Sequence, residues 1–224
     1  MKLPNRLEYI FSLCEKSEHT VDVGTDHGKL AASLILSGVA KKVTASDVNE
    51  KPLSKARILV DEMGISDKVS IVLTDGLQGL EDEYPDQIVS AGMGGELIRD
   101  ILRAAPWTKN SGIRLILQPM TTVPELRRYL LSEGFEIKLD GAVTEDEKAY
   151  DVIVAVYDGV KRECSFLNCE LGGITGKTSA EKALLIKKRA AAEKRLIGAK
   201  RNHTDEEPLL IKMIEFINES LEDA

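Results

Sequence analysis

Short apolar runs with the composition of β-strands alternate with helical patterns through the first two thirds of this 224-residue chain. Strands separated by helices pair in parallel, and the helices then cover both faces of the sheet. We therefore expect strands at 20–24, 42–48, 68–75, 86–93 and 113–119, and helices at 30–36, 51–63, 96–104 and 123–132.

Two further strand-like runs, 135–143 and 150–158, are joined only by the acidic loop TEDEKA, which favours an antiparallel pair. Together the runs predict an α/β, Rossmann-like domain over residues 1–158. Its sheet has seven strands and is parallel except for one strand near its edge.

The chain changes character after Asp158. A glycine-rich joint, LGGITGK, leads into an Ala-, Lys- and Arg-rich helical pattern, and a second helix follows within 205–221. We expect a C-terminal helical hairpin, coiled-coil-like, over residues 159–224. Its segment 177–201 holds nine basic residues against Glu181 and Glu193, a charge of +7 in a chain whose net charge is −7. Such an asymmetry points to a polyanionic partner for the hairpin alone.

The composition and the cysteine pattern indicate in which cellular compartment we expect the protein. No apolar run approaches the roughly 20 residues that a membrane span needs, and the start, MKLPNRLEYIF, is not a signal peptide. Three cysteines without a CxxC pair argue against a disulfide framework and a zinc site, and favour a reducing cytoplasm. We expect no membrane contact and no metal, and a monomer.

Chemically active residues follow the strands, where ligands of open α/β sheets bind. The turn DVGTDHG gives Asp22, Gly24, Asp26 and His27, and its glycines allow a tight turn or a close ligand. Asp47 follows Gly24 by roughly the twenty residues in sequence that are expected for an acid that accepts hydrogen bonds from ribose hydroxyls. The remaining candidates are Asp75 and Gly76 for an adenine amino group, Gly92 and Met93 against a flat ring, and Gln118 and Pro119 for a base edge.

Each of these features has an ordinary structural alternative. Asp47 could cap a helix, Asp75-Gly76 could be a simple turn, and His27 could be solvated. Together, however, three acids and a glycine–methionine turn describe a pocket for an adenosine with a cationic or zwitterionic tail. S-adenosylmethionine fits this description. NAD does not fit it, for two reasons. The glycine spacing is G-x-x-x-G rather than the G-x-G-x-x-G of dinucleotide-binding turns, and the nearby carboxylates would repel a pyrophosphate.

The segments DVGTDHGKLA, AGMGGELI and RLILQPM resemble, in this order and spacing, the bacterial tRNA adenine-N1 methyltransferases that modify adenine 22. The resemblance covers about residues 3–158 and implies a class I methyltransferase fold with a C-terminal helical hairpin. It implies that Asp26 lies beside the reactive methyl group. The cofactor pocket that it implies is lined by Asp22, Gly24, Asp47, Asp75, Gly76 and Met93.

Adenine N1 carries an in-plane lone pair, so attack on the methyl group needs no prior deprotonation. We expect Asp26 to stabilise the positive charge that develops on the ring, and His27 to orient Asp26 or cap the helix. Because N1 lies on the Watson–Crick edge, the target base must be unpaired or flipped out. RNA contacts are expected from the N-terminal Lys2 and Arg6, and from the hairpin residues Lys187, Lys188, Lys194 and Arg195.

Two other functions remain compatible with these residues. A methyltransferase of another RNA, a protein or a small molecule would have the same cofactor pocket, although only an RNA enzyme needs the basic hairpin. A non-catalytic module that binds S-adenosylmethionine is the second, and methyl transfer to any RNA would exclude it.

Overall fold

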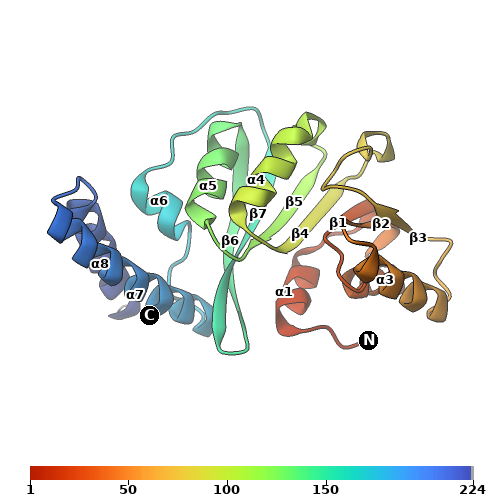
Figure 1. The fold of residues 1–224 in the computed structure, drawn as a ribbon, viewed down its shortest axis with the longest axis horizontal. Helices are drawn as coiled ribbons and strands as arrows, with labels where there is room; N and C mark the ends of the chain where they lie inside the picture. Colours follow the sequence, from red (N-terminus) through yellow and green to blue (C-terminus); the bar gives the residue numbers. More distant parts are fainter. Residues whose placement is uncertain (223–224) are drawn as a thin grey trace.

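The computed structural model describes residues 1–222, and these form a seven-stranded sheet with helices on both faces (Figure 1). The strand order is β3-β2-β1-β4-β5-β7-β6, and only β7 runs antiparallel to its neighbours. The predicted fold is therefore confirmed. The strands are β1 (Ser17–Val23), β2 (Ala40–Asp47), β3 (Val69–Leu73), β4 (Gln87–Met93), β5 (Arg114–Pro119), β6 (Phe135–Glu145) and β7 (Lys148–Tyr157).

Two hydrophobic clusters sandwich the sheet, because successive side chains of each strand point to opposite faces. In β5, Leu115 and Leu117 pack against α4 and α5, whereas Ile116 packs on the other face with α1, α2 and α3. Two short 3-10 turns, Glu81–Glu83 and Pro106–Thr108, lie in the connections. The helices of the two layers are α1 (Asn5–Leu13), α2 (Lys29–Leu36), α3 (Glu50–Glu62), α4 (Gly95–Ala104) and α5 (Val123–Ser132).

Helix α1 is an element that the sequence analysis did not predict. It is only nine residues long and begins after Pro4. Its buried Ile10 joins the cluster formed by α2, which fixes α1 against the sheet domain. Tertiary packing, rather than a long amphipathic repeat, accounts for this helix.

Strands β6 and β7 form a long hairpin that extends through most of the expected loop. Only Asp146 and Glu147 remain in the turn, with φ of 47° and 63°. A two-residue turn with positive φ at both positions matches the twist of the flanking strands. The hairpin therefore projects beyond the body of the sheet (Figure 1).

Three helices follow β7: α6 (Phe166–Leu171), α7 (Ser179–Asn202) and α8 (Glu207–Glu222). Helices α7 and α8 form the expected hairpin, at the end of the molecule opposite β3 (Figure 1). They share a separate hydrophobic cluster with Ala142 of β6 and Ala149 of β7. The cluster joins the hairpin to the projecting strands. No helix within residues 1–222 is both long enough and apolar enough to cross a membrane.

The cysteines differ from the sequence-based expectation. Cys164 and Cys169 are joined by a disulfide, and Cys14 is free. The pair lies just before and within α6, where the start of the helix brings the two residues to a Cα–Cα distance of 5.7 Å. A CxxC search could not have found this pair, because it spans five positions.

Candidate active site

A cavity lies where the carboxyl ends of β1, β2, β3 and β4 meet, as expected for the ligand crevice of a parallel sheet. Five of the predicted residues line it together: Gly24, Asp47, Asp75, Gly76 and Met93. The sequence analysis missed the other residues of its wall, which are Val23, Ser46, Val48, Thr74, Leu97 and Ile101.

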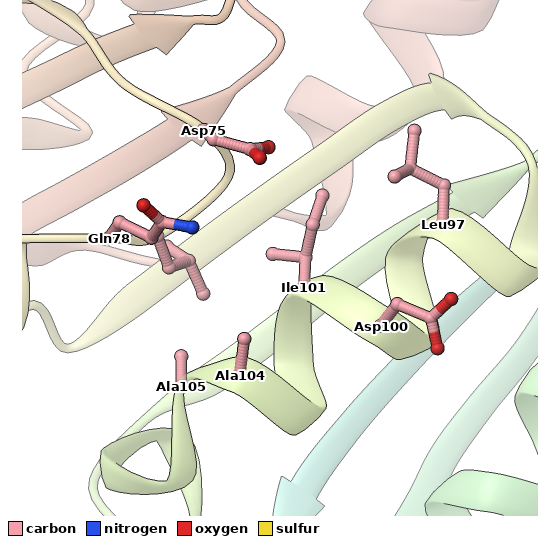
Figure 2. Close-up of a pocket in the computed structure, with 8 residues that line it drawn as sticks. Asp75, Gln78, Leu97, Asp100, Ile101, Ala104 and Ala105 are labelled. Carbon is pink, nitrogen blue, oxygen red and sulfur yellow. The ribbon is translucent and has the colours of Figure 1, made fainter.

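An adjoining cavity shares Asp75, Leu97 and Ile101 with the first one. Figure 2 shows the side chains of Asp75 and Gln78 facing the apolar side of α4 across this space. An apolar wall with a few polar groups at its rim suits a flat ring with polar edges. The helical spacing of Leu97, Ile101 and Ala105 is the sequence signal that could have identified this wall.

Two glycines of the turns lie against side chains from α4 and β4. Gly24 has φ 73°, and a Cβ there would collide with the methyl group of Met93. Gly76 has φ 61°, and a Cβ there would come within 2.8 Å of Ile101 Cγ1. Both positions therefore need glycine for conformation, and Gly76 also needs it for space beside Ile101. Met93 forms the wall opposite Gly24.

Asp22 lies beneath the turn rather than on the wall of the cavity, with 4% of its surface exposed. Its Oδ2 accepts a hydrogen bond of 2.6 Å from Thr25 Oγ1. Burial raises the pKa of Asp22 to about 6, the Thr25 hydrogen bond opposes the rise, and the charge of Asp47 adds to it. Asp22 is therefore a buried carboxyl group below the turn that keeps its proton to a higher pH than an exposed Asp does.

Asp47 and Ser46 supply polar groups at the end of β2. Asp47 Oδ1 accepts hydrogen bonds from Asn49, including its backbone N–H at 2.8 Å. Ser46 lines the cavity, and its buried Oγ has no hydrogen-bond partner within residues 1–222. An orphaned buried hydroxyl is costly, so a polar ligand at this position would satisfy it.

Asp26 and His27 continue the turn but do not line either cavity. The Asp26 side chain is 73% exposed, and its backbone has φ 53°, a left-handed conformation that Asp adopts more readily than most residues. His27 Nδ1 lies 2.8 Å from Asp26 Oδ2. Lys55 Nζ lies 2.7 Å from His27 Nε2. The exposed carboxylate is thus held by the neighbouring imidazole ring.

Gln118 is fully buried at the end of β5, and all of its polar atoms are engaged. Its Oε1 accepts from Arg6 Nη1 at 2.8 Å and from Gly92 N at 3.0 Å, and its Nε2 donates to Pro119 O at 3.0 Å. The expectation that Gln118 reads a base edge is therefore corrected: its amide fixes the turn at Gly92, where the register of β4 and β5 shifts. Arg6, from α1, also binds Glu145.

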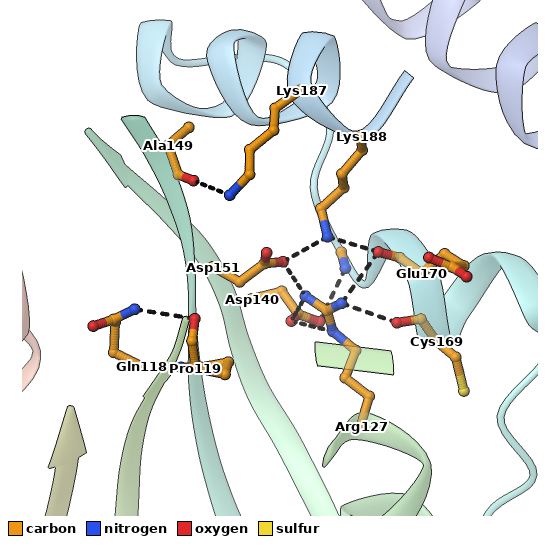
Figure 3. Close-up of polar contacts among 11 residues, drawn as sticks. Gln118, Pro119, Arg127, Asp140, Ala149, Asp151, Cys169, Glu170, Lys187 and Lys188 are labelled. Atoms are coloured by element: carbon orange, nitrogen blue, oxygen red, sulfur yellow. Dashed lines mark hydrogen bonds and ion pairs between the residues drawn. The ribbon is translucent and has the colours of Figure 1, made fainter. Parts of the chain in front are cut away.

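Lys188, which was expected to contact RNA, instead lies in an ion-pair network with only 12% of its side chain exposed (Figure 3). Its ammonium lies 3.0 Å from Asp151 Oδ1 and donates to the carbonyl of Glu170. Arg127 lies at the centre, 2.8 Å from both Asp140 and Asp151. The network joins α5, β6 and β7 to α6 and α7, and we leave Lys188 out of any RNA surface.

The other predicted basic residues of α7 lie nearer the surface. Lys187 donates to the Ala149 carbonyl at 2.7 Å, and Arg195 is paired with Glu170 and Glu206. Lys194 is exposed, and so are Lys200 and Arg201. Within residues 1–222 these last three side chains have no ion-pair partner, so their charge is available to a polyanion.

Comparisons with known proteins point to one chemistry. Residues 3–153 match the family described as "Methyltransferase domain". The tRNA (adenine(22)-N(1))-methyltransferase of Bacillus subtilis (strain 168) is 30% identical over 174 residues, which are 75% of this chain and 73% of that protein. A Streptococcus pneumoniae protein solved in complex with S-adenosyl-L-methionine superposes with a TM-score of 0.82 at 28% identity, covering 98% of this chain and 100% of that one. The structure of the B. subtilis M1A22 tRNA methyltransferase gives a TM-score of 0.80 at 24% identity over 98% of this chain and 99% of that one, which shows a shared fold.

Proposed function

The chain belongs to the family of tRNA (adenine(22)-N(1))-methyltransferases, and on this premise we propose that it transfers a methyl group from S-adenosylmethionine to N1 of adenine 22 in tRNA. The observation that carries the proposal is the cavity at the carboxyl ends of β1–β4, which brings Gly24, Asp47, Asp75 and Met93 together. The basic surface on α7 supports RNA as the substrate.

The residues around the cavity suit S-adenosylmethionine. Asp47 would accept from the ribose hydroxyls, with the unpaired Ser46 hydroxyl beside it. Asp75 would accept from the adenine amino group, and Leu97 and Ile101 would pack against the ring. Asp22 would attract the ammonium group from below. The cofactor supplies an electrophilic methyl group on a positively charged sulfur.

Asp26 would act on the target base rather than hold the cofactor. As N1 attacks, positive charge spreads over the adenine ring and its exocyclic amino group. A fixed carboxylate that accepts from that amino group stabilises this charge where it develops. The exposed position of Asp26 beside the turn, with His27 holding Oδ2, supports this role.

The RNA must reach the site with its target base unpaired, because N1 lies on the Watson–Crick edge. Three unpaired basic residues on α7, Lys194, Lys200 and Arg201, would hold the phosphate backbone. Arg6 is held at the carboxyl ends of β4 and β5 by Gln118 and Glu145, and there it would neutralise a phosphate near the target base. The sheet domain is acidic, so affinity must depend on such local patches.

The proposal includes a monomer that acts in the cytoplasm, where tRNA is made and used. The hairpin packs its buried cluster against Ala142 and Ala149 of its own chain, which is compatible with a monomer. Sedimentation with and without tRNA would measure the stoichiometry.

The function is tested by incubating the protein with isotopically labelled S-adenosylmethionine and unmodified transcripts of one tRNA. One transcript carries adenine at position 22 and the matched control carries guanine there. The proposal expects label in 1-methyladenosine after digestion of the first RNA and none in the second. Label at another position or in another nucleoside, or no transfer to any tRNA, would contradict it.

A further inference from the structure

Helix α3 packs against the turn that holds Asp26 and His27, and a glycine in this turn leaves room for it. Gly28 caps α2 with φ 71°, and a Cβ there would come within 2.9 Å of the Ala56 Cβ of α3. Both residues are small, so the two backbones can lie against each other. As a result the neighbour of Ala56, Lys55, reaches the ring of His27.

The contacts along this chain of side chains have only one consistent assignment of hydrogen atoms. A lysine ammonium can donate but cannot accept, so the 2.7 Å contact requires a lone pair on His27 Nε2. The ring proton must then be on Nδ1, which donates to Asp26 Oδ2 over 2.8 Å. Lys55 and Asp26 therefore require the same His27 tautomer from opposite sides of the ring, and Lys55 reinforces the one that holds the Asp26 carboxylate.

We propose that Lys55 is a positioning residue for methyl transfer, which acts through His27 to fix the orientation of the Asp26 carboxylate. This inference rests on the proposed function, in which Asp26 stabilises charge on the target adenine. The backbone at Asp26 is left-handed and the side chain is 73% exposed. Without an external anchor, an exposed carboxylate would sample several rotamers, and its field would be less preorganised.

The assignment also explains why a neutral imidazole is useful here. The ring links Asp26 to α3 without adding a positive charge of its own. The negative charge of Asp26 then stays available to the adenine, while the ammonium of Lys55 lies on the far side of the ring. In the opposite tautomer, the Nε2–H group would face the donating ammonium of Lys55. The lone pair of Nδ1 would then face the lone pairs of the Asp26 carboxylate, so neither contact could be a hydrogen bond.

The direct test is the tautomer of His27, measured by nitrogen NMR on protein labelled at its three histidines. The spectrum is recorded near pH 8, above the ordinary imidazole pKa of about 6.5. The proposal expects the Nδ1–H form in the wild type and a larger fraction of Nε2–H in Lys55→Met, where only the Asp26 carboxylate still favours Nδ1–H. An Nε2–H ring in the wild type, or an unchanged tautomer in Lys55→Met, would overturn it.

Kinetics then show whether the tautomer matters for the reaction. Single-turnover methylation at saturating cofactor and tRNA should fall about tenfold in Lys55→Met and recover largely in Lys55→Arg, which keeps the charged donor. In an Asp26→Asn background, Lys55→Met should cause no further loss, because the two side chains act as one unit. Lys51→Met, on the same helix and also exposed, is the matched control and should keep the wild-type rate.

Two results would overturn the kinetic part of the inference. Equal losses from Lys55→Met in the presence and absence of the Asp26 carboxylate would mean that Lys55 does not act through Asp26. A higher KM for tRNA with an unchanged saturated rate would mean that Lys55 contacts a phosphate. If the wild type itself makes no 1-methyladenosine, the proposed function fails, and the tautomer measurement alone decides whether Lys55 controls His27.

Discussion

The guanidinium of Arg6 and the side-chain amide of Gln118 meet at the carboxyl end of β5, where Arg6 Nη1 donates to Gln118 Oε1 over 2.8 Å. The same oxygen accepts from the backbone N–H of Gly92 at 3.0 Å. One buried amide thus connects the N-terminal helix to the turn that carries Met93.

Replacing Gln118 by Leu should destabilise the protein, because the Gly92 N–H and the Arg6 guanidinium lose their common acceptor. An unsatisfied buried group costs about 1–3 kcal/mol, and urea unfolding would measure the loss. Arg6→Met should have a smaller effect, and the two changes should be less than additive in a double-mutant cycle. Full additivity would show that the contact contributes nothing to the fold.

Asp22 makes stability depend on pH in a defined direction. Its folded-state pKa of about 6 lies above the roughly 3.9 of an unfolded Asp. The group therefore contributes stability that is fully present below the unfolded value and is lost as pH rises through about 6. Asp22→Asn should be the more stable protein at neutral pH, by at most about 3 kcal/mol.

The stability difference between wild type and Asp22→Asn should accordingly widen between pH 4 and pH 7 in urea titrations. Thr25→Val serves as the matched variant, because it removes the hydrogen bond that lowers the Asp22 pKa. It should move the transition to higher pH. A difference that stays constant across this range would show that Asp22 ionises normally in the fold.

Asp47→Ala should weaken binding of S-adenosylmethionine, because the ribose hydroxyls would lose a charged acceptor. A charge-assisted hydrogen bond is worth about 1.5–3 kcal/mol, so the affinity should fall about tenfold or more. Calorimetry on a variant with unchanged melting behaviour would measure it. Asp67→Ala, an exposed carboxylate beyond α3, is the control. An unchanged affinity in Asp47→Ala would remove Asp47 from the site.

Replacing Lys194, Lys200 and Arg201 by Gln in one triple variant should weaken tRNA binding and leave the affinity for the cofactor unchanged. Each lost phosphate contact lowers the slope of log affinity against log salt by about 0.7–0.9, so the slope should become shallower by about 2. The control triple, Lys16, Lys41 and Lys68, changes the same charge at the amino ends of β1–β3. Equal effects from both triples would point to net charge rather than to an RNA surface.

The sheet and its topology could be predicted from sequence because periodicity and turn residues report directly on buried faces. Helix α5 was expected at 123–132 and is found there. Helix α1 escaped prediction, because a nine-residue segment depends on packing by Ile10 rather than on its own pattern. The turn at Asp146 and Glu147 escaped for a related reason, since cross-strand pairing extends β6 and β7 into polar sequence.

The candidate site was predictable where residues lie at the end of a strand or just beyond it, as Gly24, Asp47 and Asp75 do. It was not predictable where a side chain arrives from elsewhere in the chain. Charge alone could not distinguish Lys188, which turns inward to Asp151, from Lys194, which faces solvent six residues later. Nor could it show that Gln118 faces Arg6 rather than a ligand. Burial decides these cases, and burial is a property of the whole fold.

The most direct test of the account is the single-turnover methylation rate of Asp26→Asn at saturating cofactor and tRNA. Asn keeps the shape and an acceptor for His27 Nδ1–H, but it removes the charge. The account predicts nearly normal affinity for both ligands and a rate lower by about 10²–10³-fold, as for other preorganised electrostatic groups. A normal rate at saturation would contradict it, whether Asp26 then proved to hold the cofactor or only to support the turn.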